Sequence, residues 1–235
     1  KKKGGIFKKK GKRSVKGEAG GVGGDFVYFK TQLIPKEHPD FEAVCKASTE
    51  ALSLLHHEWG LAHTEVIIPP DGPPRLIEVN GRAHNADFLG VCTACIGYNA
   101  FQVMADAYFG GCENERSEGD RDDDDDDGAQ SDDVITWEGT PRRPELLVDG
   151  AIVHLVCSVE GVVKKVDMGP IPELPSYMAH EIYESFEVGC AVEATRDIKT
   201  DGGWIHLIGE TVDEDWKVIE AWMGNIWTVE KLEEG

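Results

Sequence analysis

Two glutamates and an asparagine in the first half of the chain have side chains that suit a hard divalent cation. Glu65 lies in one β-branched segment, and Glu78 and Asn80 lie in the next. A Pro-rich turn centred on Asp71-Gly72 separates the two segments, and this pattern predicts an antiparallel hairpin. Carboxylate and amide oxygens are ligands that Mg²⁺ accepts while it keeps positions open for phosphate oxygens. The pattern therefore predicts a metal site on this hairpin.

The place of the turn also predicts the register of the hairpin. If the strands are mirrored about the turn, three cross-strand pairs share one face: Glu65 with Glu78, Ile67 with Leu76, and His63 with Asn80. The other face, with Val66, Ile68 and Ile77, is expected to join the core. Two facing carboxylates destabilise a sheet by about 0.2–1 kcal/mol unless a cation lies between them. An exposed acidic face without function is the alternative that this pattern leaves open.

Arg82 comes two residues after Asn80. Because side chains alternate between the two faces of a strand, Arg82 is predicted to lie on the same face as Asn80. Its planar guanidinium can donate paired hydrogen bonds to phosphate or carboxylate. Together with Glu65, Glu78 and Asn80, it predicts a site that handles a metal and phosphate groups.

Helices are predicted on both sides of the hairpin. Asp40 is placed to cap a helix that ends at Trp59-Gly60. The apolar residues of this helix recur at helical spacing: Phe41, Val44, Ala47, Ala51, Leu54 and Leu55. A strand is predicted before it, over 26–33, and a second, mostly apolar helix over 86–109.

The second half of the chain, from Leu146 onward, is predicted to be rich in strands. Segments 151–159 and 162–166 flank Glu160-Gly161 and predict another hairpin. Further strands are predicted over 189–194 and 204–209, and a closing helix over 213–232. Five large residues at helical spacing form a stripe that is expected to be core: Trp216, Ile219, Trp222, Met223 and Ile226.

The chain has 235 residues and a formal net charge of −20, which is unevenly distributed. Ten Lys and Arg lie within residues 1–30, and twelve acidic residues lie within 113–133. Both patterns predict disordered segments, although a basic tail could instead contact nucleic acid, anionic lipid or an import receptor. A chain this acidic repels nucleic acid overall. The sequence contains no run of about 18 consecutive apolar residues, so no membrane-spanning helix is predicted.

The chain has six cysteines, and no secretory leader is recognisable, which argues against a disulfide framework. Cys92 and Cys95 form a C-x-x-C pair, but no second pair follows at the spacing of a zinc site. Buried, reduced thiols are therefore predicted, with a metal or redox role as the alternative.

The hairpin sequence resembles the ATP-grasp superfamily, specifically carboxylate–amine ligases of the L-amino-acid ligase and carnosine-synthase type. The resemblance rests on Gly-Leu-Ala-His-Thr-Glu-Val at 60–66, Gly-Pro-Pro-Arg-Leu-Ile-Glu-Val-Asn-Gly-Arg at 72–82, and Gly-Tyr-Asn at 97–99. It implies an α+β fold: the C-terminal part of an ATP-grasp domain, with an antiparallel sheet and helices, followed by a small β-rich subdomain. The implied organisation is a disordered tail (1–24), a partial ATP-grasp domain (25–112), an acidic insertion (113–144) and the subdomain (145–235).

The resemblance also implies an activity. ATP would phosphorylate a substrate carboxylate, and an amine such as that of an amino acid would attack the acyl phosphate to form an amide or peptide bond. Glu65 and Glu78 would bind Mg²⁺ that bridges the ATP phosphates, Asn80 would complete the set, and Arg82 would neutralise charge on the transferring group. The implied setting is cytoplasmic with small-molecule partners and no membrane, and a homo-oligomer is left open.

Two departures from the family pattern matter. After Arg82 the family often continues into glycines, whereas this chain has Ala-His-Asn-Ala at 83–86; His84 is expected to be structural or exposed, with substrate contact as the alternative. Only residues 1–62 precede His63, so the family's upstream phosphate-contacting lysines are not matched, and this chain is expected to be feeble or inactive alone. A catalytically inactive binding module therefore stays open, as does a metal-dependent hydrolase that uses His63, Glu65, Glu78 and His84.

Overall fold

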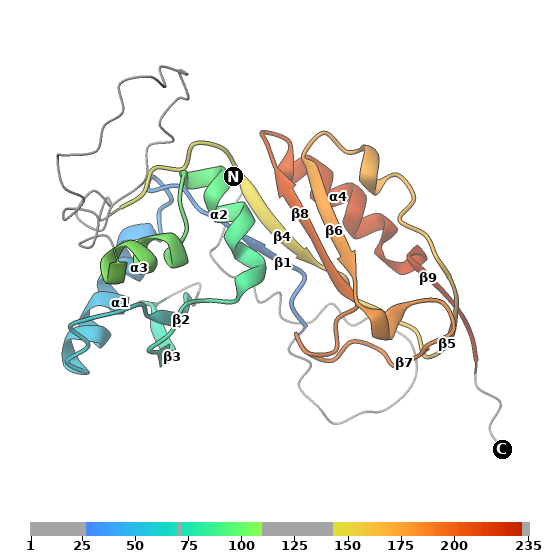
Figure 1. The fold of residues 1–235 in the computed structure, drawn as a ribbon, viewed down its shortest axis with the longest axis horizontal. Helices are drawn as coiled ribbons and strands as arrows, with labels where there is room; N and C mark the ends of the chain where they lie inside the picture. The colour runs from blue at the N-terminus through green and yellow to red at the C-terminus, as the bar shows by residue number, and fades with distance from the viewer. Residues whose placement is uncertain (1–26, 70–71, 110–142, 232–235) are drawn as a thin grey trace, which may run out of the picture. The chain divides into compact units, whose positions relative to one another are not determined.

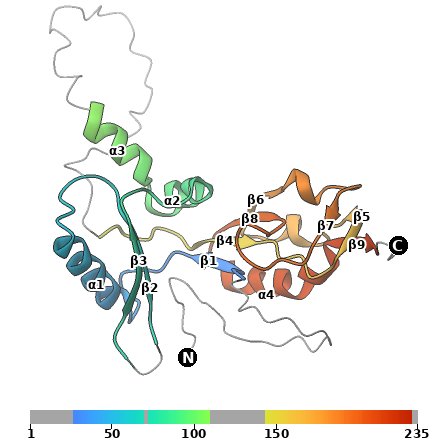
Figure 2. The same cartoon turned by 90° about the horizontal axis from the view of Figure 1, so that it is seen from below.

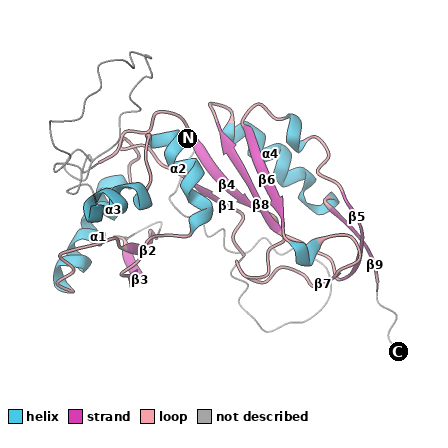
Figure 3. Ribbon diagram, in the orientation of Figure 1, coloured by secondary structure: helices cyan, strands magenta, loops and turns pink. Residues whose placement is uncertain are grey.

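The structure is a computed structural model that describes residues 27–69, 72–109 and 143–231 (Figure 1). The basic tail and the acidic run, for which disorder was predicted, lie outside these residues. The described residues form two units, one from 27–38 and 146–231 and the other from 39–109 and 143–145, apart from the gap at 70–71. Both combine helices with antiparallel strands (Figure 3), which confirms the predicted α+β class.

The unit that begins at Pro39 holds one hairpin and its helices. Its elements are α1 (Phe41–Leu54), β2 (His63–Ile67), β3 (Arg75–Asn80), a 3₁₀ turn (Ala86–Phe88), α2 (Leu89–Ile96) and α3 (Ala100–Phe109). Helix α1 lies along the hairpin (Figure 2). Asp40 occupies the predicted N-cap position, although its side chain makes no capping hydrogen bond. The helix ends at Leu54, earlier than predicted, and His56 adopts a positive φ of 52° just beyond it.

The single helix predicted over 86–109 is wrong, because the chain bends by 90° between α2 and α3. Gly97 adopts a φ of 84°, which ends α2 in the left-handed conformation that glycine tolerates. Asn99 then starts α3: its Oδ1 accepts hydrogen bonds from the backbone N–H groups of Phe101 and Gln102. In return, Gln102 Oε1 accepts the N–H of Asn99, which completes a capping box.

Within the described residues, no single helix is long and apolar enough to cross a membrane. Only the bent pair, Ala86–Ile96 with Ala100–Phe109, reaches the required length and composition when its two parts are taken together.

The C-x-x-C pair lies in α2, where both cysteines are buried. Burial, with the neighbouring Cys95 as a smaller cause, raises the pKa of Cys92 to about 11. A thiol with so high a pKa stays protonated and weakly nucleophilic at neutral pH, as expected of a packing residue.

The other unit contains two sheets and α4. The described strands form one sheet in the order β1 (Lys30–Gln32), β4 (Gly150–His154), β8 (Gly203–Ile208), β6 (Tyr177–Ile182), and another in the order β7 (Ala191–Val192), β5 (Gly161–Val166), β9 (Trp227–Glu230). The implied partial ATP-grasp domain of 25–112 includes β1, but in the structure β1 pairs with β4 and groups with residues 146–231. Lys30 at its start also forms an ion pair of 3.1 Å with Asp213.

Helix α4 (Val212–Trp222) covers one face of the larger sheet (Figures 1 and 2). The predicted stripe is confirmed as core: Ile219, Met223 and Ile226 are buried, and the two tryptophans pack against them. The Trp222 indole donates a hydrogen bond of 3.0 Å to the carbonyl of Asp167.

Two predictions for this unit are wrong. Strands β4 and β5 do not form a hairpin: β4 pairs with β1 and β8, whereas β5 pairs with β7 and β9. The closing helix ends at Trp222, and Trp227–Glu230 forms β9 instead. Strand β4 is buried along its whole length, so it takes a central position with neighbours on both sides. The local turn at Glu160-Gly161 therefore does not decide its pairing.

Asp215 on α4 ties the helix to the start of β6. Its Oδ2 accepts hydrogen bonds from the N–H of Ser176 (2.8 Å), the Ser176 hydroxyl (2.6 Å) and the Thr211 hydroxyl (2.8 Å). Burial of the carboxyl raises its pKa, but these hydrogen bonds outweigh burial, so the pKa of Asp215 lies below its ordinary value. The charged form is therefore favoured by folding.

We expect Asp215→Asn to lower the free energy of unfolding by about 1–2 kcal/mol at pH 7, because asparagine keeps an acceptor oxygen but removes the charge. This contribution is present above the unfolded-state pKa of about 3.9 and is lost as the pH falls through the lower folded-state pKa. Urea unfolding of the unmodified protein and of Asp215→Asn, at pH 7 and at pH 3, measures this difference in unfolding free energy at each pH. The exposed Glu214, 3.7 Å from Lys217, provides the control Glu214→Gln. An Asp215→Asn deficit that is equal at both pH values would contradict this account.

Candidate metal and phosphate site

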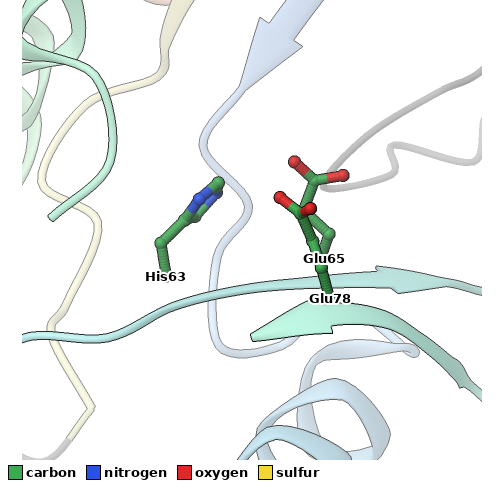
Figure 4. A group of neighbouring side chains, drawn as sticks. All are labelled: His63, Glu65 and Glu78. Atoms are coloured by element: carbon green, nitrogen blue, oxygen red, sulfur yellow. The ribbon is translucent and has the colours of Figure 1, made fainter. Parts of the chain in front are cut away.

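The hairpin brings together the two glutamates that the sequence singled out. In the β2–β3 pairing, Glu65 lies opposite Glu78 and His63 lies opposite Asn80, as the mirrored register predicted. Figure 4 shows the side chains of His63, Glu65 and Glu78 projecting from the same side of the hairpin. One potential ligand atom from each of the three lies within 4.8 Å of the others.

Beyond Glu65 the predicted register is wrong by one residue. Val66, and not Ile67, pairs with Leu76, because the register shifts between Glu65 and Val66. The shift gives β3 one extra residue, Ile77, which has no partner in the pairing and is 53% exposed instead of joining the core. A bulge of this kind twists the strand and re-aims neighbouring side chains. The irregularity therefore lies directly beside the paired carboxylates.

Asn80 supports the carboxylate of Glu78. Its Nδ2 donates a hydrogen bond of 2.8 Å to Glu78 Oε1. Because this bond uses the amide nitrogen, the amide oxygen is the atom of Asn80 that suits a metal ion. The hydrogen bond places Asn80 beside Glu78, and a metal-binding role for Asn80 stays a prediction.

His63 is the member of the cluster that the sequence did not assign to the magnesium site. Its Nδ1 is shielded from solvent and has no hydrogen-bond partner among the described residues. Burial lowers the pKa of His63, and the charge of Glu65 opposes this, while Arg82 and His84 act in the same direction as burial. The mirrored register already placed His63 two residues before Glu65 on the same face, so the signal was present in the sequence.

Arg82 lies just beyond β3 and is exposed. Its Nη1 donates a hydrogen bond of 2.8 Å to the carbonyl oxygen of Ala83. His84 donates from Nδ1 to the carbonyl oxygen of Asn85 at 2.6 Å and packs edge-on against Phe88. Both residues act electrostatically on His63, but neither belongs to the cluster of potential ligands.

The donor set fits a divalent cation. Two carboxylates supply a charge of −2, and they face each other across the strand pair, where they would otherwise repel. Oxygen atoms of this kind are the ligands of hard cations that also bind phosphate. The cluster is partly open, since His63 and Glu65 are half-buried and Glu78 is exposed.

No family model and no curated protein matches the chain. Among solved structures, it is similar to the L-amino acid ligase from Bacillus licheniformis, with a TM-score of 0.62 and 15% identity over 91% of this chain. It is also similar to phosphoribosylglycinamide synthetase from Anaerococcus prevotii, with a TM-score of 0.57 and 11% identity over 88% of this chain. The chain spans 46% of the length of each.

Both similar structures are ATP-grasp enzymes. The chain therefore shares the fold of part of these two proteins, which agrees with the fold that the resemblance implied.

Proposed function

We propose that this chain is the C-terminal part of an ATP-dependent carboxylate–amine ligase, which forms an amide or peptide bond through an acyl phosphate. The observation that carries the proposal is the pair of facing carboxylates, Glu65 and Glu78, on a hairpin of an ATP-grasp fold. The L-amino acid ligase and the synthetase that share this fold support the general kind of reaction.

In this proposal Glu65, Glu78 and Asn80 hold Mg²⁺ on the hairpin face. When bound, Mg²⁺ supplies charge neutralisation and alignment for the phosphate oxygens of ATP. The hydrogen bond from Asn80 to Glu78 keeps one carboxylate oxygen in a fixed position before the metal binds. Such preorganisation matters because phosphoryl transfer depends mainly on positioning and charge.

Arg82 stabilises the charge that develops on the reacting groups. In the first step a substrate carboxylate oxygen bonds to the γ-phosphorus, the bond to the β-phosphate bridging oxygen breaks, and ADP leaves. In the second step an amine nitrogen bonds to the acyl carbon, phosphate leaves, and the amine loses a proton. Both steps place negative charge on phosphate oxygens, which a guanidinium can contact with two parallel hydrogen bonds.

Hydroxylamine tests this proposal, because it attacks acyl phosphates to give a hydroxamate and phosphate. We expect the protein, as expressed from its own gene, to form ADP in an amount equal to hydroxamate plus amide when given ATP, Mg²⁺, hydroxylamine and a mixture of amino acids. Iron(III) colour and mass spectrometry would identify the hydroxamate, and reactions without ATP provide the control. ADP formation without any hydroxamate or amide product would overturn the proposed reaction.

A metal-dependent hydrolase is the second candidate, favoured by the position of His63 in the same cluster. Its fourth expected residue, His84, instead donates a hydrogen bond to Asn85 and lies outside the cluster. Substrate hydrolysis that needs a metal but no ATP would support the hydrolase over the ligase.

A further inference from the structure

The cluster on the hairpin includes a nitrogen donor as well as oxygens. His63 precedes Glu65 by two residues on β2, so the strand places both side chains on one face. Figure 4 shows the imidazole on the same side of the hairpin as the two carboxylates. Ligands of a metal with bonds of about 2.1 Å lie about 3–4 Å apart, so three atoms that all lie within 4.8 Å of one another can converge on one ion after modest side-chain movement.

The hydrogen bonding of the imidazole is incomplete among the described residues. Its Nδ1 is shielded from water and has no hydrogen-bond partner among the described residues. Most shielded polar side-chain atoms in folded proteins are hydrogen-bonded, so such an atom calls for an explanation. Coordination of a metal through Nδ1 would give this shielded nitrogen the partner that it lacks.

The nitrogen donor changes which cations the site prefers. Mg²⁺ binds oxygen ligands in nearly ideal octahedral geometry and gives up water reluctantly. First-row transition-metal dications accept imidazole nitrogen together with carboxylate oxygen, and their affinities rise from Mn²⁺ toward Cu²⁺. A purely oxygen-based site for Mg²⁺ would gain nothing from His63.

We infer that His63 joins Glu65 and Glu78 in a mixed nitrogen–oxygen site whose preferred occupant is a first-row transition-metal dication, for which Mn²⁺ serves as the paramagnetic probe. The inference rests on the proposed function for the two carboxylates and adds the metal class and a ligand. It makes the phosphate-handling site responsive to the supply of such metals, in addition to Mg²⁺.

Pulsed electron paramagnetic resonance with Mn²⁺ tests this directly on the full chain, without any activity measurement. We expect the spin-echo signal of bound Mn²⁺ to carry the modulation of a coordinated ¹⁴N nucleus, and the modulation to disappear in His63→Gln. The same substitution should weaken Mn²⁺ binding by about tenfold or more. Mg²⁺ binding, measured by competition, should change by less than about twofold, because Mg²⁺ depends on the carboxylate oxygens of Glu65 and Glu78, which the substitution leaves in place.

The control is His84→Gln, which removes the neighbouring imidazole and should leave the ¹⁴N modulation unchanged. Mn²⁺ binding without ¹⁴N modulation, or modulation lost in His84→Gln and kept in His63→Gln, would overturn the inference while leaving the carboxylate site intact. Glu78→Gln tests the carboxylate site separately from the His63 ligand, because it should weaken both Mg²⁺ and Mn²⁺ binding. If neither metal binds the unmodified chain, the inference and the proposed magnesium site both fail.

Discussion

Replacing Glu78 with glutamine is expected to lower the rate of ATP-dependent ADP release by about 10²-fold or more, because it removes charge stabilisation from the transition state. Glutamine keeps the size of the side chain, and its Oε1 can still accept the hydrogen bond that Asn80 donates at 2.8 Å. The substitution therefore removes one negative charge from the carboxylate pair and changes little else. The loss should appear at saturating ATP, where binding no longer limits the rate.

The measurement follows ADP release with Mg²⁺ and mixed amino acids, using the protein as expressed from its own gene. Glu50→Gln is a matched control, because Glu50 is an exposed glutamate on α1 that pairs with Lys46 at 3.7 Å. It should retain the unmodified rate, since exposed pairs of this kind contribute little. A Glu78→Gln protein as active as the control would exclude Glu78 from the metal site.

The carboxylate pair was predictable because its signal is local. The turn and the strands are adjacent in sequence, and strict alternation assigns Glu65, Glu78 and Asn80 to one face once the turn is placed. The bulge was not predictable in this way, because a shift of one residue leaves the composition of both strands unchanged. Its consequence, the exposure of Ile77, depends on the backbone path of β3.

The β-rich half was harder to predict because its strands pair across long stretches of sequence. Trp227–Glu230 follows α4 closely and has helix-compatible apolar spacing, but it pairs with Val162–Val166 and fills the edge of that sheet. Tertiary pairing of this kind overrides local propensity. The break between α2 and α3, unlike β9, has a local signal: Gly97 and the Asn99–Gln102 capping box can both be recognised in the sequence.

Arg82→Lys is expected to lower kcat by about 10²-fold while changing the KM for ATP little, because lysine keeps the positive charge but loses the planar pair of donors. Arg82 is exposed and donates to the carbonyl oxygen of Ala83, so it is free of any buried packing role. A loss of activity in Arg82→Lys is therefore not expected to come from misfolding of the hairpin. Arg82→Ala, which also removes the charge, should lose at least as much.

Steady-state measurement of kcat and KM separates the roles of Arg82, since loss of an interaction made only in the transition state lowers kcat and kcat/KM together. The matched control is Arg75→Lys, at the opposite end of β3, where the side chain is also exposed and lies across from Ile67. It should behave as the unmodified protein. Equal losses in Arg82→Lys and Arg75→Lys would indicate a general effect on the hairpin, and a rise in KM alone would assign Arg82 to ground-state binding of ATP. A selective fall in kcat would identify Arg82 as the residue that responds to charge developing during phosphoryl and acyl transfer.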